Sequence, residues 1–190
     1  DLLIVTPGSS TSSDGIRGGF GSAATLTRSD ADALASPVAA PDVAAVAPEK
    51  ETSLTLEAND TNLTTTVTGT TESWLDVRAR SLAFGEFVTA EDDADAASVI
   101  VLGSEVATEL FGRTNVVGQV VTVADTDFTV VGVLAEMGSS GDVNLDDVAV
   151  VPLSTMSESL VGGWQRRSLS TVYVQAASSD RLSAASQEVT

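Results

Sequence analysis

The chain has 190 residues, and 43% of them are hydrophobic, which is enough to bury a sizeable core as one domain or two small lobes. Its 27 acidic residues against nine Lys and Arg give a net charge of −18, which disfavours direct binding to nucleic acid or anionic lipid headgroups. With no Cys and no His, the chain lacks disulfides, thiolate metal ligands and the commonest general base.

The first part of the chain predicts a strand and a loop. The apolar run Leu2–Val5 is typical of a strand, or of the end of an upstream helix, and its abrupt start suggests a segment of a longer protein. Residues 7–25 are rich in Gly and Ser and predict a flexible loop. The glycine spacing there fits neither nucleotide-binding pattern, and no stretch of about 20 apolar residues predicts a membrane span.

The next segment predicts a helix and a hairpin. Thr27 is the expected N-cap of a helix that runs to about Ser36. A strand over residues 43–56, broken at Pro48, is followed by a turn at Asn59–Asp60 and a returning strand over residues 62–69. These elements suggest an open α+β sandwich.

The sequence pattern changes near Trp74, and from there to the end of the chain it predicts a series of short elements. The stretch Glu86–Asp95 carries five acids and is predicted to be a loop. The continuous apolar run Val99–Leu102 predicts a central strand. The remaining predicted elements are a helical turn at residues 72–77, a helix capped by Ser104 and ended by Gly112, a hairpin with its turn at residues 124–127, a loop at residues 138–141, a strand over residues 148–153 with Pro152 at an edge or exit, a helix from Ser154 or Thr155 to about Val161, a hinge at residues 162–164, a strand over residues 169–176 and a helix from Ser178 or Ser179.

Two acidic stretches are candidate sites. Asp142, Asn144 and Asp146 start like a calcium loop, but Asp147 stands where that loop needs Gly and Leu153 where it needs Glu. The acids at residues 91–95 could serve a carboxylate hydrolase only if two of them faced each other across a cleft, and an acidic solvated turn explains them better. We therefore assign no catalytic, cofactor-binding or metal-binding residue.

Other single residues have simple structural interpretations. Lys50 is expected in a solvated turn. Trp74 and Trp164 are expected to pack between lobes, although Trp164 could instead anchor a partner. Arg166–Arg167 would neutralise nearby acids, and the formal glycosylation acceptors at Asn59 and Asn62 carry no functional assignment.

Six motifs in a fixed order are similar to one known family. They are the opening from Leu3, LTRSDADAL at residues 26–34, VAAVAPE at residues 43–49, VTGTT at residues 67–71, residues 85–138 and DDVAVVPLST at residues 146–155. Together they resemble the MacB-like periplasmic core domain of MacB/FtsX-type ABC transporter permeases. The loop at residues 138–147 departs from the Gln- and Gly-rich loop of the family, which leaves the specificity for a partner open.

The resemblance implies an α+β fold with two lobes. A discontinuous porter-like lobe with βαβ units would comprise residues 1–75 and 166–190. A strand-rich, sabre-like insertion would comprise residues 76–165. Family members act outside the cell membrane, so we expect an extracytoplasmic location, periplasmic or at the cell surface.

The resemblance also implies a function in coupling and no enzymatic activity in this chain. The domain would couple cytoplasmic ATP hydrolysis to export or to force transmission. Its expected partners are a second permease subunit, a cytoplasmic ATPase reached through membrane helices that this chain lacks, and an adaptor or cargo; isolated, it should be a monomer. The alternatives are a secreted acidic binding or adhesion module and a carboxylate-based hydrolase.

Overall fold

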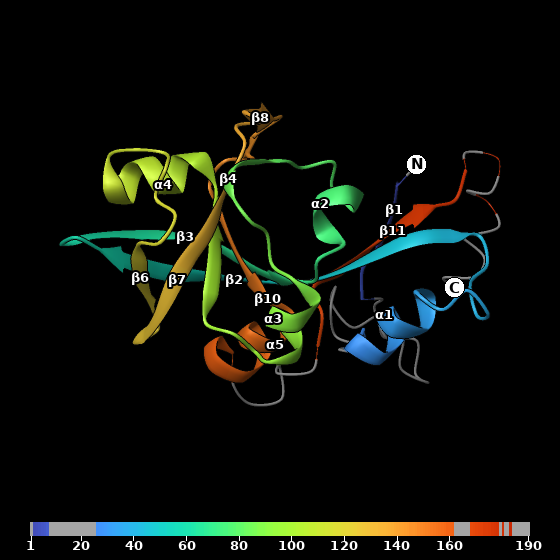
Figure 1. Cartoon of the computed structure of the whole chain (residues 1–190). Coiled ribbons are helices and arrows are strands. Elements are labelled where there is room, and N and C mark those ends of the chain that lie inside the picture. Colours follow the sequence, from blue (N-terminus) through green and yellow to red (C-terminus); the bar gives the residue numbers. More distant parts are fainter. Residues whose placement is uncertain (1, 8–25, 162–167, 179, 181–182, 184–190) are drawn as a thin grey trace, which may run out of the picture.

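The computed structural model describes residues 2–7, 26–161, 168–178, 180 and 183 (Figure 1). They form a mixed α+β fold, which confirms the predicted class at this level. The strands are β1 (Leu2–Val5), β2 (Val43–Ala58), β3 (Thr61–Thr70), β4 (Leu82–Gly85), β5 (Val99–Leu102), β6 (Val120–Val123), β7 (Thr126–Leu134), β8 (Ser139–Ser140), β9 (Val143–Asn144), β10 (Val148–Pro152) and β11 (Thr171–Ala176). The helices are α1 (Arg28–Leu34), α2 (Trp74–Val77), α3 (Ala90–Ala94), α4 (Ser104–Phe111), α5 (Leu153–Thr155) and the π-helical turn η1 (Met156–Leu160). Within these residues, no helix is both long enough and apolar enough to span a bilayer.

Strand β2 is one continuous strand, so the predicted break at Pro48 is wrong. The Glu49 carbonyl faces β11, where it accepts a hydrogen bond from the Ser170 backbone N–H at 2.8 Å. The Pro48 carbonyl faces the opposite edge, where the Thr70 hydroxyl donates to it at 2.7 Å. Because the N–H and carbonyl of a strand residue face the same edge, the N–H that proline lacks is not needed for the β2–β11 ladder.

The hairpin turns form as the sequence predicts, and one is tighter. Asn59 and Asp60 have φ angles of 49° and 62°, as in a two-residue type I′ turn. Ala124 and Asp125 repeat this geometry with φ angles of 48° and 62°. Since Val123 pairs directly with Thr126, the predicted four-residue turn between β6 and β7 is a two-residue turn.

Six strands close into a ring, which corrects the predicted open sandwich. Strand β2 pairs with β3, β3 with β10, β10 with β5, β5 with β7, and β7 with β6. Strand β6 then pairs back with β2 through Leu56↔Val123 and Glu57↔Thr122. The ring thus combines β2 and β3, from the predicted first lobe, with four strands of the predicted insertion.

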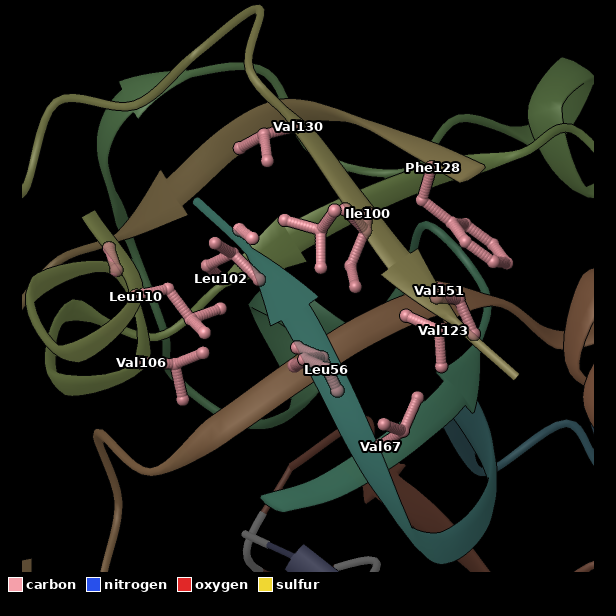
Figure 2. Close-up of a cluster of buried hydrophobic side chains, with 14 of the residues drawn as sticks. Leu56, Val67, Ile100, Leu102, Val106, Leu110, Val123, Phe128, Val130 and Val151 are labelled. Atoms are coloured by element: carbon pink, nitrogen blue, oxygen red, sulfur yellow. The ribbon is translucent and has the colours of Figure 1, made fainter. Parts of the chain in front are cut away.

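Alternate residues of the ring strands enter two different cores. In β5, Ile100 and Leu102 belong to a cluster that also holds Leu56, Phe128 and Val130. Figure 2 shows these side chains converging from several ring strands, with Val106 and Leu110 of α4 beside them. Val101, between Ile100 and Leu102, belongs to a second cluster around Trp74 and Phe87. Burial on both faces explains why β5 reads as a continuous apolar run.

Beyond the ring, the first half of β2 continues into a smaller sheet. Strand β11 pairs with β2 over Thr171↔Glu49 to Ala176↔Val43, and β1 pairs with the other edge of β11. Ala31 of α1 packs in a third cluster with Val46, Val172 and Val174. One long strand is therefore shared by the ring and by the sheet with β11 and β1.

The end signals at Thr27 and Gly112 are confirmed, and the cap predicted at Ser104 lies one residue earlier. Thr27 caps α1, and its backbone N–H donates to the Asp30 carboxylate at 2.8 Å. Gly112 ends α4 with a φ of 69°, as predicted, but Gly103 rather than Ser104 is the N-cap. Pro152 stands at the exit of β10, which lies between β3 and β5 and not at an edge.

Several predictions fall on residues beyond those that the structure describes. They are the Gly/Ser-rich loop over residues 8–25, the hinge at residues 162–164, Arg166–Arg167 and most of the C-terminal helix. The predicted loop at residues 138–141 forms the small β8–β9 hairpin, and the predicted last strand is β11.

Candidate functional site

A buried polar cluster lies against β2 at the point where the strand passes from the smaller sheet into the ring. It consists of Glu49, Trp74, Arg78, Arg80 and Tyr173, and we call it the Glu49 cluster. Glu49 is only 2% exposed and Trp74 only 3%. The Trp74 indole Nε1–H donates a hydrogen bond to Glu49 Oε1, and the Arg78 Nε lies 3.9 Å from the same oxygen.

Helix α2 presents Trp74 and Arg78 to β2 because its first turn is bonded to that strand. The Ser73 hydroxyl donates to the Val46 carbonyl at 2.5 Å, and the Thr71 and Ser73 hydroxyls share a further bond of 3.1 Å. The Trp74 ring stacks on Phe87 with centroids 5.7 Å apart and planes 10° apart. These contacts fix the indole where its N–H meets the carboxylate.

The two arginines are held mainly by aromatic rings. The Arg78 guanidinium carbon lies 4.1 Å from the centroid of the Tyr173 ring, and that of Arg80 lies 5.6 Å from the Trp74 centroid. Arg80 Nη2 donates to the Leu145 carbonyl at 2.9 Å. Its buried Nε has no hydrogen-bond partner in the part of the chain that the structure describes. Burial accordingly lowers the pKa of Arg80.

The electrostatic balance of Glu49 favours its neutral form. Burial raises the pKa of Glu49 from 4.5 to about 7, and the neighbouring charge of Glu51 adds to this effect. The Trp74 hydrogen bond and the Arg78 charge lower the pKa by less. The pKa of Tyr173 is also raised, chiefly by burial and then by the charge of Glu49.

A groove of about 480 Å³ opens above this cluster. Glu49, Trp74, Arg78 and Arg80 line one side of it, and residues 142–145 of the β8–β9 hairpin line another. The hairpin is anchored by the buried Asp146, whose carboxylate accepts the backbone N–H groups of Met137 and Gly138 at 2.9 and 2.8 Å. The groove therefore has a firmly anchored outer wall.

A second groove, of about 460 Å³, lies between α1 and α3. Ala31, Ala35, Ala90 and Ala94 line it, and an ion pair between Arg28 and Asp93 bridges it. Asp93 is buried and also accepts the Ser154 backbone N–H at 2.9 Å. The hydrogen bond to Asp93 raises the pKa of Arg28, and burial lowers this pKa by less.

The sequence predicted a solvated loop over residues 86–95, but part of this stretch is helical and one of its acids is buried. Residues 90–94 form α3, and Asp92 closes a capping box with Thr89. Asp93 is buried in the ion pair with Arg28. Two of the candidate hydrolase carboxylates thus have structural partners.

The calcium-like segment is also held by internal hydrogen bonds. The Asp146 carboxylate accepts the backbone N–H groups that anchor the β8–β9 hairpin. Asp147 accepts the Thr65 hydroxyl at 2.6 Å, and Asn144 donates to Glu105. No group of three or more acids suited to holding a metal ion occurs among residues 2–7, 26–161 and 168–178.

Lys50 and Trp74 were the other residues singled out from sequence. The prediction of a solvated turn at Lys50 is wrong: it is 5% exposed within β2, and its Nζ donates to the Ser168 carbonyl at 2.6 Å. Trp74 is buried in the cluster around Ala47, Phe87 and Val101. No sequence pattern pointed to Glu49, because its partner Trp74 is distant in the chain and the stretch PEKET resembles a turn.

Comparison with known proteins places this geometry in a family. The model of the MacB-like periplasmic core domain matches residues 1–190. A macrolide export ATP-binding/permease protein MacB from Azoarcus sp. (strain BH72) is 34% identical over 190 residues, which are 100% of this chain and 27% of that protein. A second MacB, from Wolinella succinogenes, is 31% identical over 85% of the chain and 24% of its own length. The chain thus spans about a quarter of these curated relatives.

Two solved structures share the fold. The periplasmic region of MacB from Actinobacillus actinomycetemcomitans matches with a TM-score of 0.78 and 20% identity, over 100% of this chain and 80% of that one. The extracellular domain of the ABC-type transporter YknZ from Gram-positive bacteria matches with a TM-score of 0.79 and 20% identity, over 100% and 90%. At this identity the likeness concerns the fold alone.

Proposed function

Because the chain belongs to the family of MacB-like periplasmic core domains, we propose that it couples ATP hydrolysis on the cytoplasmic side to movement outside the cell membrane. It is the periplasmic or extracellular domain of a MacB-like ABC transporter permease. Its partners would be a second permease subunit, the ATPase, and an adaptor or cargo. The family match over residues 1–190 is the observation that carries this proposal.

The proposed movement takes place between two lobes, the smaller sheet with α1 and the six-strand ring, because a boundary between residues 75 and 76 would cut the ring pairings of β3 with β10 and of β2 with β6. The groove between α1 and α3 supports this division, because small side chains on both helices leave room for closure. The Arg28–Asp93 ion pair joins residues 65 positions apart, across the proposed boundary. The Arg28 side chain is about half exposed, whereas Asp93 is buried. Water can therefore solvate Arg28 more readily than Asp93 when the ion pair breaks.

The test measures the groove in the whole transporter that contains this chain. Spin labels would be placed at Ala35→Cys on α1 and Ala94→Cys at the end of α3, both of which are exposed and line the groove. The 190-residue chain has no cysteine of its own to compete for the label. We expect the distance distribution to change between the nucleotide-free and the vanadate-trapped transporter.

A matched pair within the ring provides the control. Labels at Glu109→Cys on α4 and Asp125→Cys in the β6–β7 turn are both exposed and should keep one distance in both states. If the Ala35–Ala94 distribution is the same in both states, the domain does not change shape with the ATPase cycle, and the proposed coupling is wrong.

A further inference from the structure

Glu49 combines deep burial with weak pairing. Its carboxylate accepts one hydrogen bond from an uncharged donor, the Trp74 indole. Among the described residues, the cation nearest to it is Arg78, at 3.9 Å, whereas a well-paired buried carboxylate usually receives two guanidinium N–H groups at about 2.8 Å. Arg78 is instead placed over the Tyr173 ring. Protonation of Glu49 would therefore weaken few contacts, and it would remove the free-energy cost of burying a charge.

The groups that face Glu49 come from every element packed around it. Glu51 follows two residues later on the same face of β2 and repels a second negative charge. Arg78 from α2 attracts the charge, and Tyr173 from β11 contributes a neutral ring. Arg80 lies over Trp74, and Asp142 and Asp147 line the same groove. Lys50 points to the opposite face of β2, where it bonds to Ser168.

We propose that the Glu49 cluster is a proton-binding site, and that its occupancy decides whether Arg78 is attracted to β2. With the proton bound, Glu49 is neutral and Arg78 keeps only its contact with Tyr173. With the proton released, the charge draws Arg78 toward the carboxylate and closes the inner wall of the groove. Histidine, the side chain that usually supplies this sensitivity, is absent from the sequence, so no imidazole contributes to the site.

This inference goes beyond the coupling function and does not depend on it, because proton binding can be measured without transport. The probe is the proton itself, in a pH titration of the 190-residue chain with ¹³C-labelled glutamate side chains, followed by NMR. One carboxyl resonance should titrate with a midpoint of about 7 and should be absent in Glu49→Gln. The Trp74 indole N–H resonance should follow the same midpoint, and Trp164→Phe assigns it between the two tryptophans.

Two further variants test whether the neighbouring charges shift the midpoint of Glu49 in the expected directions. Glu51→Gln removes the repelling neighbour and should lower the midpoint, whereas Arg78→Gln removes the attracting one and should raise it. A Glu49 carboxyl that titrates in the ordinary range near 4.5 would overturn the proposal. So would an indole resonance that titrates unchanged in Glu49→Gln. If Glu49→Gln does not fold, the direct titration of the unsubstituted chain still decides.

Discussion

Glu49→Gln should make the protein more stable above neutral pH and leave its stability almost unchanged below pH 5. Glutamine has the size of a protonated glutamate, and its side-chain oxygen can still accept the Trp74 N–H. The substitution therefore removes the charge and little else. The parent protein, in contrast, must bury a charged carboxylate that is 2% exposed when the pH is high.

The magnitude follows from the difference between the folded and unfolded states. The pKa of Glu49 is about 7 in the fold, against an ordinary value of 4.5. Below pH 4.5 both states hold the proton; between the two values only the folded state holds it, so the free energy of unfolding falls as the pH rises. Above pH 7 the loss is complete and amounts to about 3 kcal/mol. Glu49→Gln escapes this loss.

Urea unfolding followed by circular dichroism, at several pH values from about 5 to about 9, measures the effect as the difference between variant and parent. Taking the difference cancels the pH dependence of the other carboxylates. Glu57→Gln is the matched control, because it removes the same charge from an exposed position further along β2 and should show no comparable trend. A difference between Glu49→Gln and the parent that stays constant over this range would refute the reasoning.

Three further substitutions test the other contacts by urea unfolding and hydrogen exchange. Asp93→Ala removes the carboxylate that pairs with Arg28 and accepts the Ser154 N–H, and should cost about 3 kcal/mol, whereas the exposed Asp95→Ala should cost less than about 0.5 kcal/mol; equal costs would contradict the buried ion pair. In Gly132→Ala the added Cβ would lie 2.0 Å from the Glu86 carbonyl and should cost about 2 kcal/mol or more, against about 1 kcal/mol for Gly112→Ala, where only the positive φ opposes it. Asp146→Ala should speed the amide exchange of residues 137–145 while the exchange of β5 stays slow; unchanged exchange in the hairpin would mean that the carboxylate does not anchor it.

Elements with local signals could be predicted from the sequence. Thr27 and Asp30 form their capping box within one turn, and Asn59–Asp60 sets its own turn through residues that tolerate positive φ. The run Val99–Leu102 predicted a central strand because both of its faces are apolar. In each case the interaction that decides the structure lies within a few residues of the pattern.

The closed ring and the Arg28–Asp93 ion pair depend on residues that are far apart in the sequence. Strand β6 closes the ring by pairing with β2, about 66 residues earlier in the sequence, and nothing in VVTV specifies that partner. Asp93 was read as part of a solvated stretch because its partner, Arg28, is 65 residues away. A charged residue next to other charged residues looks exposed in sequence, and only the fold shows which of them is buried.

The position of Glu49 on β2 gives the proton site a route to the rest of the molecule. Glu49 pairs with Thr171 of β11, and the next residue, Lys50, pairs with Gly69 of β3 at the start of the ring. Seven residues after Glu49, Leu56 lies fully buried in the ring core beside Val67 and Ile100. A β-strand hydrogen-bonded along its length resists bending, so a change at Glu49 that shifts β2 must also act on the ring or on the β11 sheet. If the two lobes move as proposed, the site therefore lies on the strand that has to carry the movement.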